Sequence, residues 1–283
     1  MTADVIAPTN DPLGEDAAME DLLAKWNAEH GATDDDVSEA SVDEEDKYKH
    51  EVDVTDNALD HIVLGTSDLT KALDTFEAAT GVRPVSVTTM NGLGTKSARV
   101  AFNGCAYLEI IGPDAKQSPT ELSQKLEKIP DGEMVPIHYG VRSTTSEDRK
   151  SGWKADMGLS VDKITMVCAD QEGMPWKWDL YILEGHEYGG LVPNFVHWPD
   201  VHAASKLPIV GNLEGVAIRA PSDNIVHKLL AGIDGVDVEI SDETCLGFTF
   251  SSDKGLHSYS SEEPIGVTFP QEGGLPVEKT GYE

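Results

Sequence analysis

Basic residues are scarce in this sequence: 21 Lys and Arg stand against 51 Asp and Glu, which gives a net charge of −30 over 283 residues. A protein that binds nucleic acid needs a basic surface to contact phosphates, so this balance argues against a nucleic-acid partner. It argues equally against docking on an anionic membrane. No apolar run is long enough to span a bilayer, and the N-terminus lacks the pattern of a signal peptide.

Cysteine is also rare, with three widely spaced residues, Cys105, Cys168 and Cys245. An odd number without close pairs argues against a disulfide framework and against a zinc site built from cysteine pairs. An intracellular, reduced protein fits this usage, and we expect a cytoplasmic location. The sequence also lacks a dinucleotide-binding fingerprint, a phosphate-binding loop and a serine-nucleophile elbow.

The acidic residues are concentrated at the start of the chain. Residues 1–56 contain 18 Asp or Glu and 3 Lys, which is half of the net charge. Such a segment buries too little apolar area to offset the entropy lost on ordering, so we predict a disordered acidic arm. Within it, residues 16–30 place apolar side chains at helical spacing, typical either of a transient helix or of a helix that docks on a partner. Residues 271–283 are predicted to form a loose tail.

Hydrophobic periodicity divides the remaining chain into three blocks with the same order of elements. The first block begins with a strand at 59–64 and a helix that ends at Gly81, and three short strands follow up to residue 111. The same order of strand, helix, strand, strand, strand recurs over 136–198 and again over 213–260. A spacing of about 77 residues indicates an internal repeat.

The first block resembles one half of a vicinal oxygen chelate protein, the superfamily of glyoxalases and extradiol dioxygenases. The likeness rests on its outer strands, which read Asp-His-Ile-Val at 60–63 and Tyr-Leu-Glu-Ile-Ile at 107–111 and are typical of glyoxalase-like proteins. The resemblance implies an α+β fold in which βαβββ modules form curved, mostly antiparallel sheets around a cleft, with helices outside. We expect paired modules over 57–200 and a third βαβββ-like module over 201–270. An odd number of modules leaves one cleft face unpaired, which favours a homodimer.

The resemblance also implies a metal site between two modules, with one ligand from the first and one from the last strand of each. Aligning the first two blocks places His61 opposite His138 and Glu109 opposite His197, so these four residues are the predicted ligands. Imidazole and carboxylate groups suit Zn, Fe, Mn, Co or Ni better than Ca or Mg. Each His also has a simpler interpretation as a hydrogen-bonded strand residue. A carboxylate flanked by Leu and Ile, in contrast, needs a buried partner.

Other residues are assigned roles around this predicted metal. Glu109 is the predicted catalytic base as well as a ligand. Tyr107 lies on the same strand face as Glu109, and Arg142 on that of His138, so both are predicted to contact substrate. Arg142 also suits a structural ion pair. His202, in a loop, is expected to be exposed.

The type of reaction stays open between three alternatives. A divalent metal that chelates the oxygens of a small carbonyl substrate stabilises an enolate, which is the isomerase or lyase chemistry of glyoxalases. The same ligands suit an extradiol-type Fe(II) dioxygenase. The third alternative is a protein of this fold that binds a small ligand without a metal.

Overall fold

The computed structural model describes residues 56–86, 92–104, 106–169, 175–199 and 201–267. Residues 1–55, the helix predicted at 16–30 and the tail at 271–283 lie outside these ranges, so the expectations for them stay predictions. None of the helices that the structure describes is long and apolar enough to cross a membrane.

The first block contains the predicted succession of strand, helix and strands. Its elements are β1 (Ala58–Gly65), α2 (Leu69–Thr80), β2 (Val85–Ser86), β3 (Thr95–Phe102) and β4 (Tyr107–Pro113). Helix α2 begins where the Asp68 side chain accepts a hydrogen bond from the Lys71 N–H, and it ends at Gly81 in the left-handed region, φ 86°. Both ends follow from local sequence, which explains why they could be predicted.

The second block repeats this arrangement after a short helix, α3 (Glu121–Leu126). Its elements are β5 (Val135–Arg142), α4 (Ser146–Met157), β6 (Ser160–Ala169), β7 (Pro175–Glu184), η1 (Gly189–Leu191) and β8 (Asn194–His197). In each block the first strand runs parallel to the last, β1 to β4 and β5 to β8. The antiparallel pair β1–β5 joins the blocks into one sheet. This pairing confirms the predicted α+β, glyoxalase-type fold.

The third block has the predicted order of elements but a different pairing. It comprises η2 (Ala203–Lys206), β9 (Ile209–Ala220), α5 (Val226–Leu229), β10 (Val236–Ile240), β11 (Cys245–Ser252) and β12 (Gly255–Ser261). Strand β9 lies between β10 and β11, and β12 pairs with β11 instead of with β9. The expectation of a third βαβββ-like module is therefore wrong in its topology. The periodicity of a strand shows which residues are buried, but it does not show which strand lies beside it.

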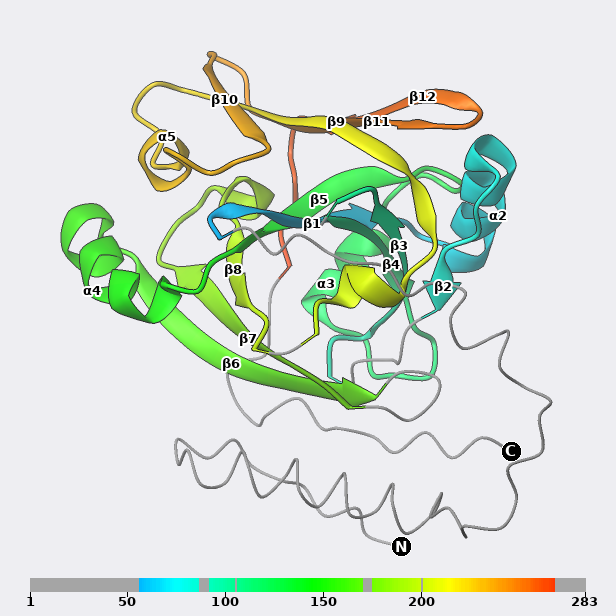
Figure 1. Ribbon diagram of the computed structural model, residues 1–283, viewed down its shortest axis with the longest axis horizontal. Helices are drawn as coiled ribbons and strands as arrows, with labels where there is room; N and C mark the ends of the chain where they lie inside the picture. Colours follow the sequence, from blue (N-terminus) through cyan, green and yellow to red (C-terminus); the bar gives the residue numbers. More distant parts are fainter. Residues whose placement is uncertain (1–55, 87–91, 105, 170–174, 200, 268–283) are drawn as a thin grey trace, which may run out of the picture.

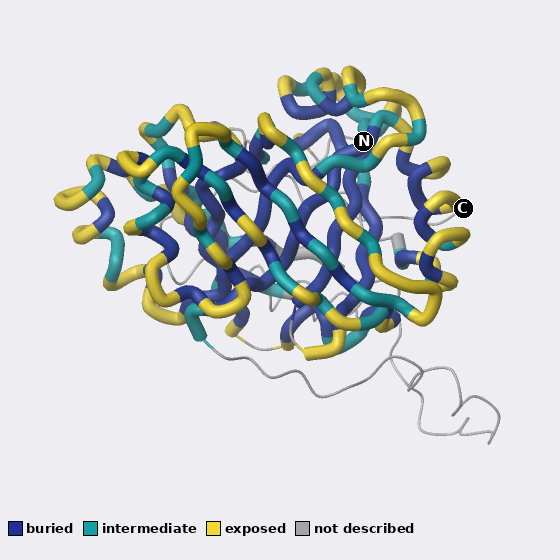
Figure 2. The backbone as a smooth tube through the Cα atoms, turned by 90° about the horizontal axis from the view of Figure 1, so that it is seen from above, coloured by how far each residue is buried: buried dark blue, intermediate teal, exposed yellow. Residues whose placement is uncertain are grey.

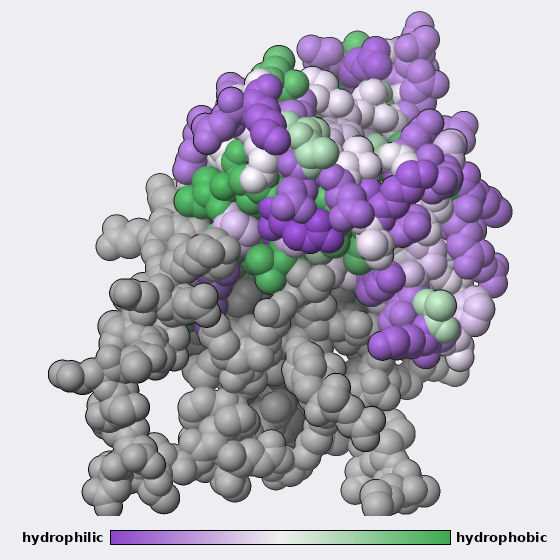
Figure 3. Space-filling view, turned by 90° about the vertical axis from the view of Figure 1, so that its right-hand side faces the viewer, coloured by the Kyte–Doolittle hydropathy of each residue, from purple (hydrophilic) through white to green (hydrophobic). Residues whose placement is uncertain are grey.

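The main core lies on the outer face of the central sheet. There α2, α4 and the strands of the third block cover β1 and β5, and Figure 1 shows these strands as a layer above them. Strand β9 continues the sheet by pairing with β3 at Ala101 and Phe102. The buried strands cross the middle of the molecule in Figure 2, with exposed loops at their ends. Hydrophilic side chains cover most of the described part of the face in Figure 3, as the acidic composition requires.

The inner face of the central sheet carries two smaller apolar clusters. One joins Tyr107 to residues of β6, β7, β8 and η2, and the other joins Val63 to α3. The predicted homodimer is not tested by this single chain and stays a prediction.

Candidate functional site

A small cavity of about 60 Å³ lies between the two inner clusters. It has room for a small molecule, since a single water needs roughly 10–15 Å³ of such space. Its wall combines a few polar side chains with a larger apolar surface, as ligand sites commonly do. The polar members are His61, Thr95, Ser97, Arg99, Tyr107, Glu109, His138 and Asn194.

Three of the four predicted ligands come together on adjacent strands. Val63 of β1 is in register with Glu109 of β4 on one side and with His138 of β5 on the other. His61 lies two residues before Val63 and therefore points to the same face of the sheet. His61, Glu109 and His138 all line the cavity, so the register brings together three groups that are distant in sequence.

Glu109 already has a buried cationic partner, Arg99 of β3. The two residues are a cross-strand pair, and Nε and Nη2 of Arg99 each lie 3.0 Å from Oε1 of Glu109. Burial acts to raise the pKa of Glu109, but the charge of Arg99 and the hydrogen bond from Ser97 outweigh it and hold the pKa below its ordinary value. Glu109 is therefore ionised at neutral pH. Arg99 supplies the buried partner that a carboxylate between Leu and Ile requires.

His138 has the least satisfied side chain of the site. It is only 4% exposed, and within the described residues neither of its ring nitrogens has a hydrogen-bond partner of good geometry. The pKa of His138 is lowered to about 3, mainly by burial and further by the neighbouring His61 and His186, while the Asn194 side chain acts in the opposite direction. The ring is neutral at pH 7. Because buried polar atoms are nearly always paired, these two nitrogens are available to a group bound in the cavity.

His61 is held in a narrow slot. Its Nδ1 lies 2.7 Å from Oδ1 of Asp60, which makes Nε2 the ring nitrogen available to the cavity. One side of the ring stacks on Tyr107, with ring centroids 4.9 Å apart. On the neighbouring strand, a Cβ added to Gly140 would lie 2.3 Å from Cε1 of His61, so only glycine leaves room for the imidazole there.

The other predicted site residues fall in different places. Tyr107 lines the cavity, and its predicted contact with substrate stays a prediction, whereas Arg142 is buried and does not line the cavity. His197 points to the opposite face of the sheet: it alternates with Val196 of the inner cluster and lies 3.9 Å from Asp179. The prediction that His197 joins the other ligands is not supported by this arrangement. The equivalent of Glu109 on β8 is Asn194, which lines the cavity.

The strand register explains why Asn194, and not His197, is the equivalent of Glu109. His61 pairs with Tyr107 in the first module, two residues before Glu109. In the second module Gly140 pairs with Asn194, so the position two residues after the partner of His138 is Asn194 itself. The chain forms the turn η1 up to Leu191, and β8 begins only at Asn194.

Several cavity residues were missed from the sequence. Arg99 was the one that the sequence could have indicated, because it is the single charged residue within the apolar part of strand β3. Trp178 lines the cavity from β7, and Val267 reaches it from beyond β12. His202, expected to be exposed, is instead buried beside Asp60; nothing in its loop sequence indicated that contact.

A sequence model of the glyoxalase-like domain matches residues 59–233, more than half of the chain. The chain belongs to the glyoxalase-like domain family. The matched region contains β1 to β9 and every polar cavity residue, but it ends before Val267. No curated protein sequence matches the chain.

Solved structures of similar fold are distant in sequence. Methylmalonyl-CoA epimerase from Mycobacterium tuberculosis is 14% identical over 53% of this chain and 95% of its own, with a TM-score of 0.38. A variant of the Streptomyces coelicolor epimerase, in complex with 2-nitronate-propionyl-CoA, is 17% identical over 53% and 99%, with a TM-score of 0.39. A hypothetical protein from Staphylococcus aureus is 14% identical over 71% and 85%, with a TM-score of 0.46. Likenesses at this level say nothing about the substrate of the glyoxalase-like chain.

Of the three predicted ligands in the cavity, the two histidines can bind a divalent metal as they stand, and Glu109 cannot. His138 offers two buried nitrogens that no described residue engages with good hydrogen-bond geometry, and His61 offers Nε2. Glu109 is held by Arg99, and among the described residues no three His, Cys, Asp or Glu side chains are arranged to hold a metal as they stand. Metal binding by all three therefore requires Glu109 to leave Arg99.

Proposed function

We propose that this glyoxalase-like protein is a divalent-metal-dependent isomerase or lyase that acts on a small carbonyl substrate with neighbouring oxygens, through an enolate-type intermediate. The observation that carries the proposal is His138, whose two buried nitrogens have no hydrogen-bond partner of good geometry among the described residues, in a cavity that also holds His61 and Glu109. His61, His138 and Glu109 are the residues that would hold the metal. When bound, the metal would supply Lewis-acid polarisation of the substrate oxygens.

The chain's own residues divide the remaining work. Glu109 is ionised and lies in the cavity wall, so it can accept a proton from the carbon next to the carbonyl. Arg99 keeps this carboxylate charged and, once Glu109 moves, can pair with a negative oxygen of the substrate. Trp178, Leu180 and Met166 form an apolar wall that limits water around the reacting carbon.

Elemental analysis of protein purified without chelators or an affinity metal tests the proposal. We expect about one divalent ion per chain in the wild type, in line with a site that has three protein ligands. His138→Ala should lose the ion. His197→Ala is the matched control and should retain it, because His197 lies on the other face of the sheet. A wild-type protein with no stoichiometric metal would overturn the proposal.

A second candidate is a metal-free protein that binds a small anionic ligand. The observation that favours it is the Arg99–Glu109 pair, which already neutralises the carboxylate that a metal would need. In that case Arg99 and the two imidazoles would contact the ligand directly. The metal analysis separates the two candidates, and oxygen uptake after loading with Fe(II) would detect a dioxygenase of the same fold.

A further inference from the structure

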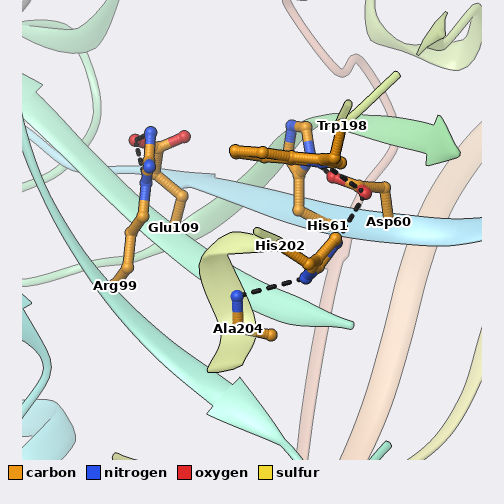
Figure 4. A network of polar contacts seen from close by, with 7 residues as sticks. All are labelled: Asp60, His61, Arg99, Glu109, Trp198, His202 and Ala204. Carbon is orange, nitrogen blue, oxygen red and sulfur yellow. Dashed lines mark hydrogen bonds and ion pairs between the residues drawn. The ribbon is translucent and has the colours of Figure 1, made fainter. Parts of the chain in front are cut away.

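Asp60 is a buried carboxylate at the centre of a hydrogen-bond network behind the cavity. It is 0% exposed. The pairing of β1 with β5 is irregular between Leu59 and His61, and such a bulge lets neighbouring side chains lie on the same side of a strand. Asp60 and His61 therefore meet, although adjacent strand residues normally point to opposite faces (Figure 4).

Three ring nitrogens surround this carboxylate. Oδ1 faces Nδ1 of His61 at 2.7 Å, while Oδ2 lies 3.0 Å from Nε1 of Trp198 and 2.9 Å from Nε2 of His202. The far nitrogen of His202, Nδ1, accepts a hydrogen bond from the backbone N–H of Ala204 at 3.1 Å. Figure 4 shows this network as a group separate from the Arg99–Glu109 pair.

The position of each proton follows from this chain of contacts. A backbone N–H only donates, so Nδ1 of His202 is unprotonated and its Nε2 carries the proton. The indole of Trp198 also only donates, so Oδ2 of Asp60 receives two hydrogen bonds. Two N–H groups that donate to one carboxylate oxygen in a buried site favour the ionised form of Asp60. An ionised carboxylate only accepts, so the proton between Asp60 and His61 belongs to Nδ1 of His61.

We infer that Asp60, oriented by His202 and Trp198, is a positioning residue that fixes His61 in the tautomer with a bare Nε2 facing the cavity. His61 is then a metal donor or a proton acceptor, and it is not a hydrogen-bond donor to substrate from that nitrogen. This inference uses the site of the proposed function, but it concerns the free protein and does not require a metal.

The experiment is ¹⁵N NMR of histidine-labelled, metal-free protein, because ring nitrogen shifts distinguish protonated from bare nitrogens. The His61 signals are assigned from their loss in His61→Gln. In the wild type we expect a protonated Nδ1 and a bare Nε2. In Asp60→Asn, His202 and Trp198 hold the amide oxygen at the Oδ2 position, so the amide N–H₂ faces His61. The amide then donates to Nδ1, and we expect the tautomer to invert.

A second measurement uses the wild type and the variant with Co²⁺ as the probe. Loss of a residue that orients a metal ligand typically weakens binding by 10- to 100-fold, and we expect this loss for Asp60→Asn. Asp253→Asn is the matched control, because Asp253 is exposed in the turn between β11 and β12. A protonated Nε2 in the wild type, or a tautomer unchanged in Asp60→Asn, overturns the inference. The wild-type spectrum decides even if the variant does not fold. If the tautomer is as assigned but Co²⁺ does not bind the wild type, the metal-dependent function fails and this inference stands.

Discussion

The slot that holds His61 predicts a specific penalty for adding one methyl group at Gly140. The new Cβ would lie 2.3 Å from Cε1 and 2.6 Å from Nδ1 of His61, far inside the carbon contact distance of roughly 3.5–4.0 Å. The ring cannot retreat, because its other side stacks on Tyr107, which is itself buried. Gly140→Ala must therefore displace the imidazole and disturb its hydrogen bond to Asp60.

The magnitude follows from a comparison with a second glycine. Gly152 lies in helix α4 and would bring its Cβ within 4 Å of nothing. Replacing glycine by alanine within a helix or strand gains roughly 0.5–1 kcal/mol from backbone entropy. Overpacking costs about 1–3 kcal/mol. The backbone gain is common to both variants, so the free energy of unfolding of Gly140→Ala should be about 1–3 kcal/mol below that of Gly152→Ala.

Urea unfolding of both variants measures this difference, provided that the free energy of unfolding depends on urea concentration with the same slope in each. The displaced ring should also show in the ¹⁵N spectrum of His61, which Gly152→Ala should leave unchanged. Equal unfolding midpoints for the two variants, with an unaltered His61 signal, would show that a methyl group at residue 140 does not clash with the His61 ring and would refute the reasoning.

Three more predictions concern the site and the arm. Glu109→Gln leaves Arg99 buried without its carboxylate, so we expect the free energy of unfolding to fall by roughly 3–5 kcal/mol. Adding Arg99→Met should recover most of this loss. Equal stabilities of the wild type and Glu109→Gln in denaturant unfolding would contradict the expectation. The folded-state pKa of His138, about 3, lies below the unfolded value of 6.5. The unfolded chain therefore binds the proton first as the solution is acidified, and the free energy of unfolding decreases as the pH falls. With chelator present, wild type should lose up to about 1.4 kcal/mol per pH unit more than His138→Gln between pH 6 and 4, and parallel curves would refute it. Deleting residues 1–55 should leave the melting temperature nearly unchanged, whereas deleting 1–57 should lower it, because Asp56 accepts the N–H of Thr144.

The expectation for Glu109 differs from the one that the sequence supports. A site on a water-filled cleft tolerates the loss of a carboxylate, so the sequence alone predicts little change in stability for a Glu109 variant. The structure instead places Glu109 against Arg99 with both side chains buried. Removing one member of such a pair leaves an uncompensated charge, and this turns a neutral substitution into a destabilising one.

Most elements could be predicted from the sequence because their signals are local. The cap at Asp68, the left-handed Gly81 and the apolar face of α2 all lie within a few residues of one another. The pairing of β9 with β3, β10 and β11 depends on contacts across the fold, and no local pattern carries that information. The sequence therefore predicted the strands of the third block and not its topology.

The candidate site shows the same division. His61, Glu109 and His138 could be proposed because each belongs to a strand with a recognisable pattern. His197 was misplaced because the alignment was shifted by three residues, and an odd shift moves a side chain to the other face of the sheet. Asp60 stands within the same motif as His61, but its direction depends on an irregularity in the β1–β5 pairing that the motif does not reveal.

The third block contributes to the site although none of the cavity residues lies on its described strands. His202, in the segment that leads into β9, binds Asp60 and so acts on His61. Strand β9 pairs with β3, the strand that carries Arg99. After β12 the chain returns to the inner face (Figure 1). There the Gly266 N–H donates to the Ile137 carbonyl, and Val267 lines the cavity. Val267 lies beyond the family match at residues 59–233, so this part of the cavity wall comes from outside the matched region. The third block therefore supports the cavity from three directions, which gives a structural reason for its attachment to a pair of glyoxalase-like modules.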